Sequence, residues 1–232
     1  MSIVDTSSAP TTGRERAKQA RIQRALDAAR SILRREGVEG LQIRSIADEA
    51  GLAVRTLYNQ FSGGKLDVLM ALMSQELDDL AQALEQLHLD DGIEISRAVI
   101  TVSIDRFRKS EDVMRPLMSL TYGTTDEQTA YLGNKARQLQ ERAVAKAMED
   151  GQLRAIMPPR VLGHFILDAY ANAGHRWARG ALDHEGFEAQ ALNAWACLLL
   201  GLAEGDTRTR LEAEIAALAP RVEQLVDRRR NT

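Results

Sequence analysis

The sequence predicts an all-α fold, in which a small N-terminal group of helices precedes a larger helical domain. Two observations favour helices. Residues with high helix propensity, such as Ala, Leu, Arg and Glu, are abundant, whereas aromatic residues make up only 4% of the chain. Apolar residues recur every three or four positions along much of the 232-residue sequence, and no alternating Val, Ile or Thr runs with hairpin turns occur.

The most informative stretch runs from residue 43 to residue 61. Apolar residues recur at helical spacing from Ile43 to Ala50, and Gly51 then ends that helix, because a sharp turn needs a residue that tolerates positive φ. A second helical pattern follows, with Val54, Leu57 and Phe61 on one face. We interpret the two short helices as a helix-turn-helix, whose second helix enters the DNA major groove. The alternative is a plain αα-hairpin.

Charge is distributed unevenly along the chain. The net charge is −3, but residues 14–65 hold 11 Lys and Arg against 6 Asp and Glu, a local charge of +5. Residues 66–232 hold 19 against 26, a charge of −7, and Asp5 brings the total back to −3. A basic N-terminal segment followed by an acidic remainder is expected when only the N-terminal segment binds the phosphates of a nucleic acid.

Periodicity and end signals predict the remaining elements. Residues 1–13 are rich in Ser, Thr, Ala and Pro and are expected to form a disordered tail. Pro220 should kink or split the last helix, and Cys197 lies in an apolar run and is expected to be a packed core thiol. The remaining helices are expected at about 14–35, 65–88, 93–109, 110–122, 128–149, 158–180, 187–204 and 207–229.

The N-terminal pattern resembles the DNA-binding domain of TetR-type repressors. The resemblance covers about 50 residues: a first helix, Gly40, Ile46-Ala47-Asp48-Glu49-Ala50-Gly51, Thr56-Leu57-Tyr58, and Phe61 before a Lys. It implies a helix-turn-helix domain over residues 14–65 and a ligand-binding and dimerisation domain over residues 66–232.

Two positions depart from the family pattern. Gln42 stands where the family often has a Thr that opens the second helix, so one N-cap and one phosphate contact are in doubt. Ser62-Gly63-Gly64 places Lys65 four residues after Phe61, one more than usual. This insertion is expected to re-aim the recognition helix slightly.

The resemblance also implies which residues contact DNA. Arg55 is the best candidate for a guanine edge, since its fork matches O6 and N7, whereas Tyr58 and Lys65 are expected to hold phosphate. The sequence also offers Arg14, Arg16, Lys18 and Arg21 as an arm on DNA or, equally, as a solvated helix start. The expected DNA-binding residues are Arg44, Ser45, Arg55, Thr56, Tyr58, Asn59 and Lys65.

Bulky, adaptable side chains on the middle helices suggest a ligand pocket, with ordinary core packing as the alternative. A polar stripe at helical spacing, His164, Asp168 and His175, is expected to serve a ligand, a dimer contact or neither. In the resembled family this region encloses a ligand cavity. The expected ligand-binding residues are Met70, Met73, Phe107, Met114, Met118, Tyr122, Phe165 and Asp168.

The helices expected at 158–180 and 187–204 carry apolar or small residues over a wider arc of their surface than a single core-facing side needs. The resemblance implies that they form a four-helix bundle with a second copy of the chain. The expected dimer-interface residues are Leu162, Ile166, Ala169, Ala173, Ala194, Leu198 and Gly201.

These patterns predict a homodimeric, ligand-responsive repressor of a roughly palindromic operator. We expect no catalytic residues, metal or cofactor: Gly-x-Ser-x-Gly and nucleotide-binding loops are missing, and the Glu85-x-x-His88 pair has no second copy. No signal peptide is apparent, and the longest apolar run, 194–200, is shorter than the ~20 residues of a membrane span, so the protein is expected in the cytoplasm. The rival is a helical carrier or enzyme that retains the N-terminal fold; a weaker one is a constitutive DNA-organising protein.

Overall fold

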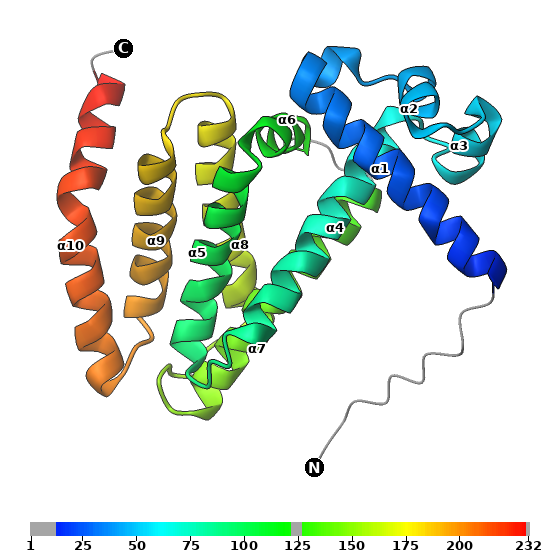
Figure 1. Ribbon diagram of the computed structural model, residues 1–232. Helices are drawn as coiled ribbons and strands as arrows, with labels where there is room; N and C mark the ends of the chain where they lie inside the picture. The colour runs from blue at the N-terminus through cyan, green and yellow to red at the C-terminus, as the bar shows by residue number, and fades with distance from the viewer. Residues whose placement is uncertain (1–12, 122–126, 231–232) are drawn as a thin grey trace. The chain divides into compact units, whose positions relative to one another are not determined.

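The computed structural model describes residues 13–121 and 127–230, and over these ranges it contains helices and no sheet. This confirms the predicted all-α fold. The helices are α1 Gly13–Gly40, α2 Ile43–Ala50, α3 Val54–Gln60, α4 Lys65–Gln86, α5 Gly92–Lys109, α6 Glu111–Thr121, α7 Glu127–Glu149, α8 Pro159–Ala178, α9 His184–Leu200 and α10 Gly205–Arg230 (Figure 1).

Three features differ from the expected elements. α1 continues to Gly40, with a bend at Gly37, where φ is 67°. α9 begins at His184 rather than Phe187, because Asp183 accepts a hydrogen bond from the Gly186 N–H at 2.7 Å and so supplies the N-cap. α10 runs through Pro220 without being split.

The chain divides into two compact units, unit 1 of residues 1–72 and unit 2 of residues 73–232, and the division falls within α4. In unit 1, α1 packs on α2 and α2 packs on α3. Ala25, Ala29 and Ile32 of α1 and Ile46 and Ala47 of α2 are each at most 1% exposed. The 3.6-residue period of α1 therefore places one face in the core of the unit.

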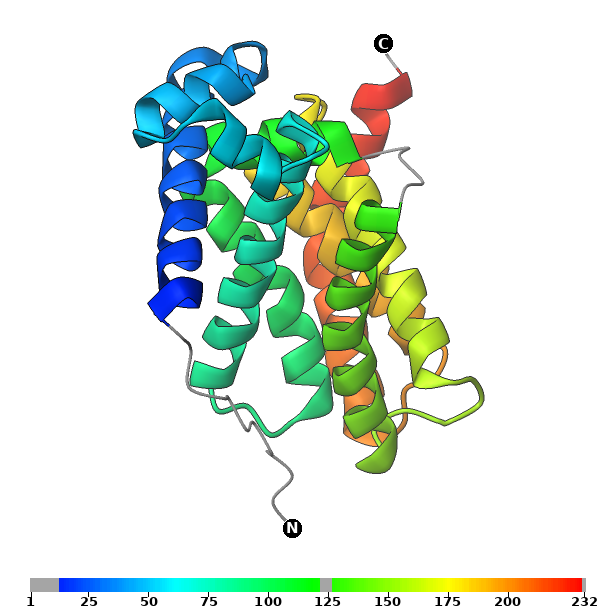
Figure 2. The same ribbon diagram turned by 90° about the vertical axis from the view of Figure 1, so that its right-hand side faces the viewer.

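In unit 2, α9 packs between α8 and α10, and α7 packs on both α8 and α5 (Figure 2). Three rings hold the middle of this unit together. The Phe107 and Phe187 rings lie 6.0 and 5.6 Å from the Trp177 ring, and Trp177 and Phe187 are fully buried. Burial of such large apolar groups is a main source of stability in the unit.

A buried polar network joins three helices of unit 2. Ser96 of α5 donates to Gln140 Oε1 of α7 at 2.7 Å, and Gln140 Nε2 donates to the Ser96 carbonyl at 3.0 Å. Trp195 Nε1 of α9 donates to Ser96 Oγ at 2.9 Å. Because these groups satisfy one another away from water, the network fixes how α5, α7 and α9 are aligned.

Cys197 is exposed, so its prediction as a core thiol was wrong. The apolar run of α9 is wider than the face that packs inside unit 2: Trp195 and Leu199 are buried on that face, whereas Cys197 lies on another. None of the described helices is both long and apolar enough to cross a membrane.

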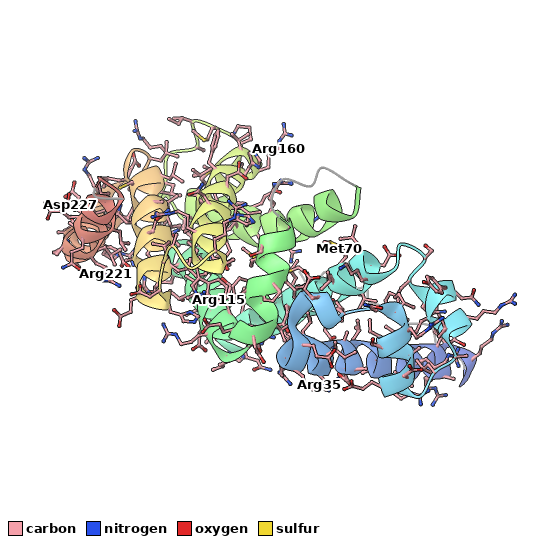
Figure 3. All side chains as sticks on the ribbon, turned by 90° about the horizontal axis from the view of Figure 1, so that it is seen from above. Arg35, Met70, Arg115, Arg160, Arg221 and Asp227 are labelled. Atoms are coloured by element: carbon pink, nitrogen blue, oxygen red, sulfur yellow. The ribbon has the colours of Figure 1, made fainter. Side chains whose placement is uncertain are left out.

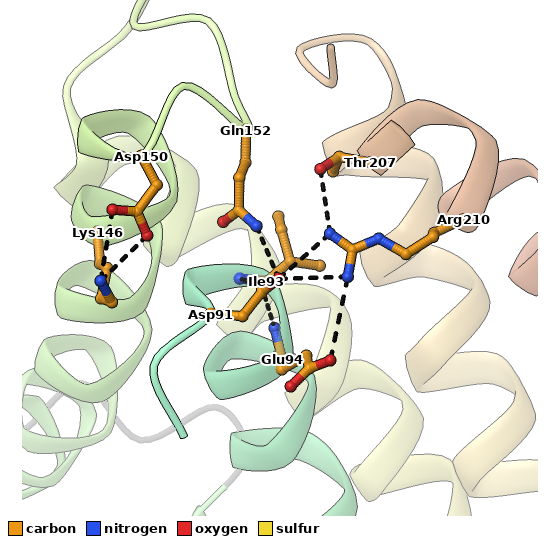
Figure 4. Close-up of polar contacts among 8 residues, drawn as sticks. All are labelled: Asp91, Ile93, Glu94, Lys146, Asp150, Gln152, Thr207 and Arg210. Atoms are coloured by element: carbon orange, nitrogen blue, oxygen red, sulfur yellow. Dashed lines mark hydrogen bonds and ion pairs between the residues drawn. The ribbon is translucent and has the colours of Figure 1, made fainter. Parts of the chain in front are cut away.

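Asp91 joins the starts of α5 and α10 to the loop after α7 (Figure 4). Its Oδ1 accepts from the N–H groups of Ile93 at 2.8 Å and Glu94 at 3.0 Å, which is an N-cap of α5. Its Oδ2 accepts from Gln152 Nε2 at 2.8 Å and from Arg210 at 3.2 Å. Burial alone would raise the pKa of Asp91, but the Glu94 N–H, Gln152 and Arg210 together lower it.

We predict that Asp91→Ala lowers the free energy of unfolding of unit 2 by about 1–2 kcal/mol, chiefly through loss of the cap. Because the folded pKa is lowered, this contribution is present above the unfolded pKa of about 4 and is lost as the pH falls through the folded pKa. Urea unfolding at several pH values measures it. Asp150→Ala, which removes only an exposed pair with Lys146 at 3.1 Å, is the control and should cost at most about 0.5 kcal/mol. A difference between wild type and Asp91→Ala that persists at low pH would contradict this account.

Candidate DNA interface and ligand cavity

The turn between α2 and α3 has the geometry that the sequence predicts. Gly51 adopts φ 61° and ψ 42°, a left-handed conformation, and its N–H donates to the Asp48 carbonyl at 3.3 Å. The Leu52 N–H donates to the Ala47 carbonyl at 2.9 Å. Leu57 of α3 is 1% exposed and Ala47 is fully buried, so a small residue on α2 and an anchor on α3 fix the crossing of the two helices.

The predicted DNA-binding residues lie on the surface of unit 1. Arg55, Tyr58 and Asn59 of α3 are exposed, and Tyr58 shows 52% of its surface despite its large ring. Thr56 and Ser45 are half-buried, and Arg44 and Lys65 are exposed at the first turns of α2 and α4. Gln42 caps α2 with no side-chain hydrogen bond, as its identity suggested.

The cations of this surface differ from others in unit 1. Within the described part of the chain, Arg44, Arg55 and Lys65 form no ion pair, so their charges are available to phosphate or base edges. Arg35, in contrast, donates to Glu49 at 2.9 Å and joins α1 to α2. That hydrogen bond is the main reason why the pKa of Glu49 is lowered.

The insertion before α4 is a hydrogen-bonded turn. The Gly63 N–H donates to Asp67 Oδ2 at 2.7 Å, and the Gly64 N–H donates to the Phe61 carbonyl at 3.0 Å. Gly64 has φ 71°, which an L-residue rarely adopts, so an alanine there would strain the backbone. Asp67 therefore connects the turn after α3 to the first turn of α4.

A cavity of about 260 Å³ lies among α4, α5, α6, α7 and α8 of unit 2. Its wall is mostly apolar, with a few polar groups. The lining residues are Met73, Glu76, Leu77, Leu80, Val99, Ile100, Ser103, Arg106, Phe107, Met118, Arg137, Leu139, Gln140, Ile166, Leu167, Asp168, Tyr170, Ala171 and His175.

The cavity contains only part of the predicted ligand-binding set. Met73, Phe107, Met118 and Asp168 line it. The other four do not: Met70 is buried in unit 1, Met114 is fully buried in the core, Phe165 is 49% exposed, and Tyr122 lies outside the described residues.

Sequence reasoning missed two cavity hydroxyls, Ser103 and Tyr170. Ser103 lies on the same face of α5 as Ile100 and Phe107, so a polar residue within an apolar stripe was the available signal. Its hydroxyl donates to the Ile100 carbonyl at 2.8 Å. Burial raises the pKa of the neighbouring Tyr170, and Ser103 opposes this only in part, so the phenol stays protonated and able to donate.

The charged groups of the cavity wall balance one another. Arg106 donates to Glu76 at 2.9 Å and to Asp79 at 3.0 Å. Arg137 Nε donates to His164 Nδ1 at 3.0 Å, which leaves the proton of a neutral imidazole on Nε2, 3.3 Å from Asp168 Oδ2. The two arginines and two carboxylates on the wall thus carry no net charge.

The predicted polar stripe on α8 therefore separates into two parts. His164 joins Asp168 of the cavity wall to Arg137 of α7. His175 is only 9% exposed and also lies on the cavity wall. Burial lowers the pKa of His175, which favours its neutral form.

The predicted dimer-interface residues also separate into two sets. Leu162, Ile166 and Ala173 are at most 2% exposed and belong to the core of the single chain. A different side of α8 therefore faces the surface, and Ala169 is half-buried there. Ala194 and Leu198 of α9 are half-buried too, and the following Gly201 is exposed.

The family model described as "Bacterial regulatory proteins, tetR family" matches residues 25–72, the segment that contains α2 and α3. The N-terminal segment of the chain therefore carries the TetR-family sequence pattern. It is 27% identical over 137 residues to the transcriptional repressor KstR of Mycolicibacterium smegmatis, over 59% of this chain and 67% of that protein. Two further KstR proteins match over 62% of their own lengths, so the chain spans about two thirds of these curated relatives.

Solved structures of repressors share the fold over most of the chain. SmeT, the repressor of a Stenotrophomonas maltophilia multidrug efflux pump, aligns with a TM-score of 0.62 and 22% identity, over 82% of this chain and 94% of SmeT. Thermus thermophilus FadR, solved in complex with lauroyl-CoA, aligns with a TM-score of 0.67 and 20% identity, over 79% of this chain and 96% of FadR. KstR is a transcriptional repressor, which favours a regulator over the rival carrier or enzyme.

Proposed function

We propose that this chain is a TetR-type transcriptional repressor that binds a palindromic operator as a dimer and leaves it when a small molecule fills the cavity of unit 2. The observation that carries the proposal is α3: Leu57 is buried beneath it, while Arg55, Tyr58 and Asn59 are exposed on its other face. A helix held in this way presents hydrogen-bonding groups to base edges in the major groove. Such a function implies a cytoplasmic location, where the chromosome lies.

We predict that Arg55→Ala and Lys65→Ala weaken DNA binding in different ways. Loss of Arg55 should cost about 1–3 kcal/mol and relax discrimination at one base pair in each half-site, because its guanidinium reads a guanine edge. Loss of Lys65 should weaken all sequences alike, because it holds phosphate. Selection from a random duplex pool, followed by competition between the selected site and its single-base variants, measures both effects. An Arg55→Ala protein with unchanged base preference would remove Arg55 from base readout.

The dimer of this proposal would use the exposed edges of α8 and α9. Phe165 is 49% exposed on α8, and Leu198 and Ala194 lie half-buried on α9. Incompletely buried apolar side chains on two helices that pack together are the kind of surface that oligomer interfaces bury. Two-fold symmetry would then present the two α3 helices to half-sites about one turn of DNA apart, roughly 34–36 Å, or a multiple of it.

We predict that Leu198→Glu abolishes the dimer, because it would place an unpaired charge in a desolvated contact at a cost of several kcal/mol. Val226→Glu, on α10, is the control, since Val226 is 46% exposed outside the proposed interface. Sedimentation equilibrium measures the oligomeric state, and circular dichroism shows whether both variants fold. Ala173→Glu is unsuitable as a test, because Ala173 is fully buried within the chain. A folded, dimeric Leu198→Glu protein would place the interface elsewhere.

The effector proposed for the cavity is a small, apolar and uncharged molecule. A volume of about 260 Å³ is slightly below the usual range for ligand pockets, roughly 300–1,000 Å³, so the ligand must be small. The carboxylates that contact Arg106 already balance its charge, so an anionic ligand would compete with them. The buried Tyr170 hydroxyl remains as a donor for a neutral acceptor, such as a carbonyl oxygen.

We predict that methyl hexyl ketone raises the thermal midpoint of the protein more than octanoate does, although both have the same number of carbons. Tyr170→Phe should weaken ketone binding by about 2- to 12-fold, the equivalent of one net hydrogen bond of roughly 0.5–1.5 kcal/mol. Isothermal titration calorimetry measures the affinities. Tyr58→Phe makes the same chemical change on α3 and should leave ketone binding unaltered. Tighter binding of octanoate, or equal ketone affinity in the Tyr170→Phe protein, would contradict the proposed effector chemistry.

A further inference from the structure

Gly174 is a glycine that the backbone of α8 does not require. It is buried inside the helix and does not have the positive φ that glycine alone adopts easily, in contrast to Gly51 and Gly64. Glycine weakens the interior of a helix relative to alanine. A glycine at such a position therefore suggests that another part of the molecule needs the space beside it.

The space beside Gly174 is filled by Met118 of α6. A Cβ atom added at position 174 would lie 2.7 Å from Met118 Cε and 3.3 Å from Phe187 Cζ. Favourable contacts between carbon atoms are about 3.5–4.0 Å long. The terminal methyl group of Met118 thus occupies the place that a side chain at position 174 would take, and we call this space the Gly174 notch.

A second contact, one turn away, aligns α6 with α8. Arg115 of α6 lies over the Trp177 ring of α8, 4.9 Å from its centroid (Figure 3). On each helix the two contacting residues are three positions apart, so both contacts lie on the facing sides of helices that pack together. The alignment of α6 on α8 therefore holds the Met118 methyl group in the Gly174 notch.

Met118 also lines the cavity, so the same side chain borders both the notch and the ligand space. Methionine is unbranched and has three rotatable side-chain bonds, so its methyl group can be redirected easily. It has no room to move further behind the notch, because the Trp177 and Phe187 rings are fully buried and stack 5.6 Å apart. A methyl group displaced from the notch would therefore enter the cavity.

We propose that Gly174 determines the length of the ligand that the cavity accepts, because it keeps the end of Met118 out of the ligand space. The inference rests on the proposed binding of a neutral, apolar effector and adds the residue that sets its size. The ligand class is a straight-chain ketone whose apolar tail occupies the space beside Met118. A larger residue at position 174 would push the Met118 methyl group into the cavity and exclude part of that tail.

Calorimetric titration of methyl propyl ketone and methyl hexyl ketone into wild type and Gly174→Ala tests the proposal. The Gly174→Ala protein should bind methyl hexyl ketone about fourfold more weakly, the factor that corresponds to ~0.8 kcal/mol for one methylene that is no longer buried. Its affinity for the shorter ketone should be unchanged, because the shorter tail does not need the lost space. Gly13→Ala makes the same change at the start of α1, where a Cβ atom meets nothing within 4 Å, and should alter neither affinity.

Removal of the Met118 side chain separates this effect from a general disturbance of the core. In a Met118→Ala background, a Cβ atom at position 174 has no methyl group to displace, so Gly174→Ala should no longer change the ratio of the two ketone affinities. The Met118→Ala protein itself should gain affinity for methyl nonyl ketone relative to methyl hexyl ketone, because its cavity is larger. Circular dichroism shows whether each variant folds, and the Met118→Ala result decides the proposal if Gly174→Ala does not fold.

A weaker affinity for the longer ketone in Gly174→Ala, which disappears in the Met118→Ala background, supports the inference. An equal loss in both backgrounds, or an unchanged ratio of ketone affinities in a folded Gly174→Ala protein, would overturn this inference alone. If Gly174→Ala does not fold, a Met118→Ala protein with the ligand preference of wild type would overturn it. Absence of ketone binding by wild type would instead overturn the proposed effector.

Discussion

The left-handed turn at Gly51 is the constraint on which the candidate DNA interface depends. With φ at 61°, the chain turns sharply after α2. Helix α3 then crosses α2 at Ala47, whose small side chain allows a close approach, and Leu57 is buried in the core. This crossing decides which side of α3 faces outward, and therefore leaves Arg55, Tyr58 and Asn59 exposed. A residue that excluded the left-handed conformation would tilt α3 and misplace all its donors together.

The fold and the helix-turn-helix could be predicted from sequence because both depend on local patterns. A few neighbouring residues suffice to recognise the helical periodicity, the end of a helix at Gly51 and the apolar anchor at Leu57. The structure places the ends of α2 and α3 within one residue of their expected positions. End signals that depend on a single side chain were less reliable. Asp183 moved the start of α9, and α10 continued through Pro220.

The cavity could be predicted only in part, because periodicity gives the direction in which a side chain points and not which neighbour it meets. Met114 and Met118 are one turn apart on α6, yet only Met118 reaches the cavity, while Met114 is enclosed by the core. The wall also depends on residues far apart in sequence, such as Ser103 on α5 and Tyr170 on α8. In the same way, Leu162 and Ala173 belong to an apolar face that the chain buries within itself.

The central claim is that ligand in the cavity and DNA on α3 favour different states of the chain, which α4 links because it contributes to both units. The most direct test is to titrate methyl hexyl ketone into the protein with and without a saturating operator duplex. A hundredfold coupling, about 2.7 kcal/mol, would weaken ketone binding by the same factor when operator is bound, because such coupling is reciprocal. The account predicts a weaker ketone affinity in the presence of operator. Equal affinities in the two titrations would show that the cavity, although occupied, does not control DNA binding.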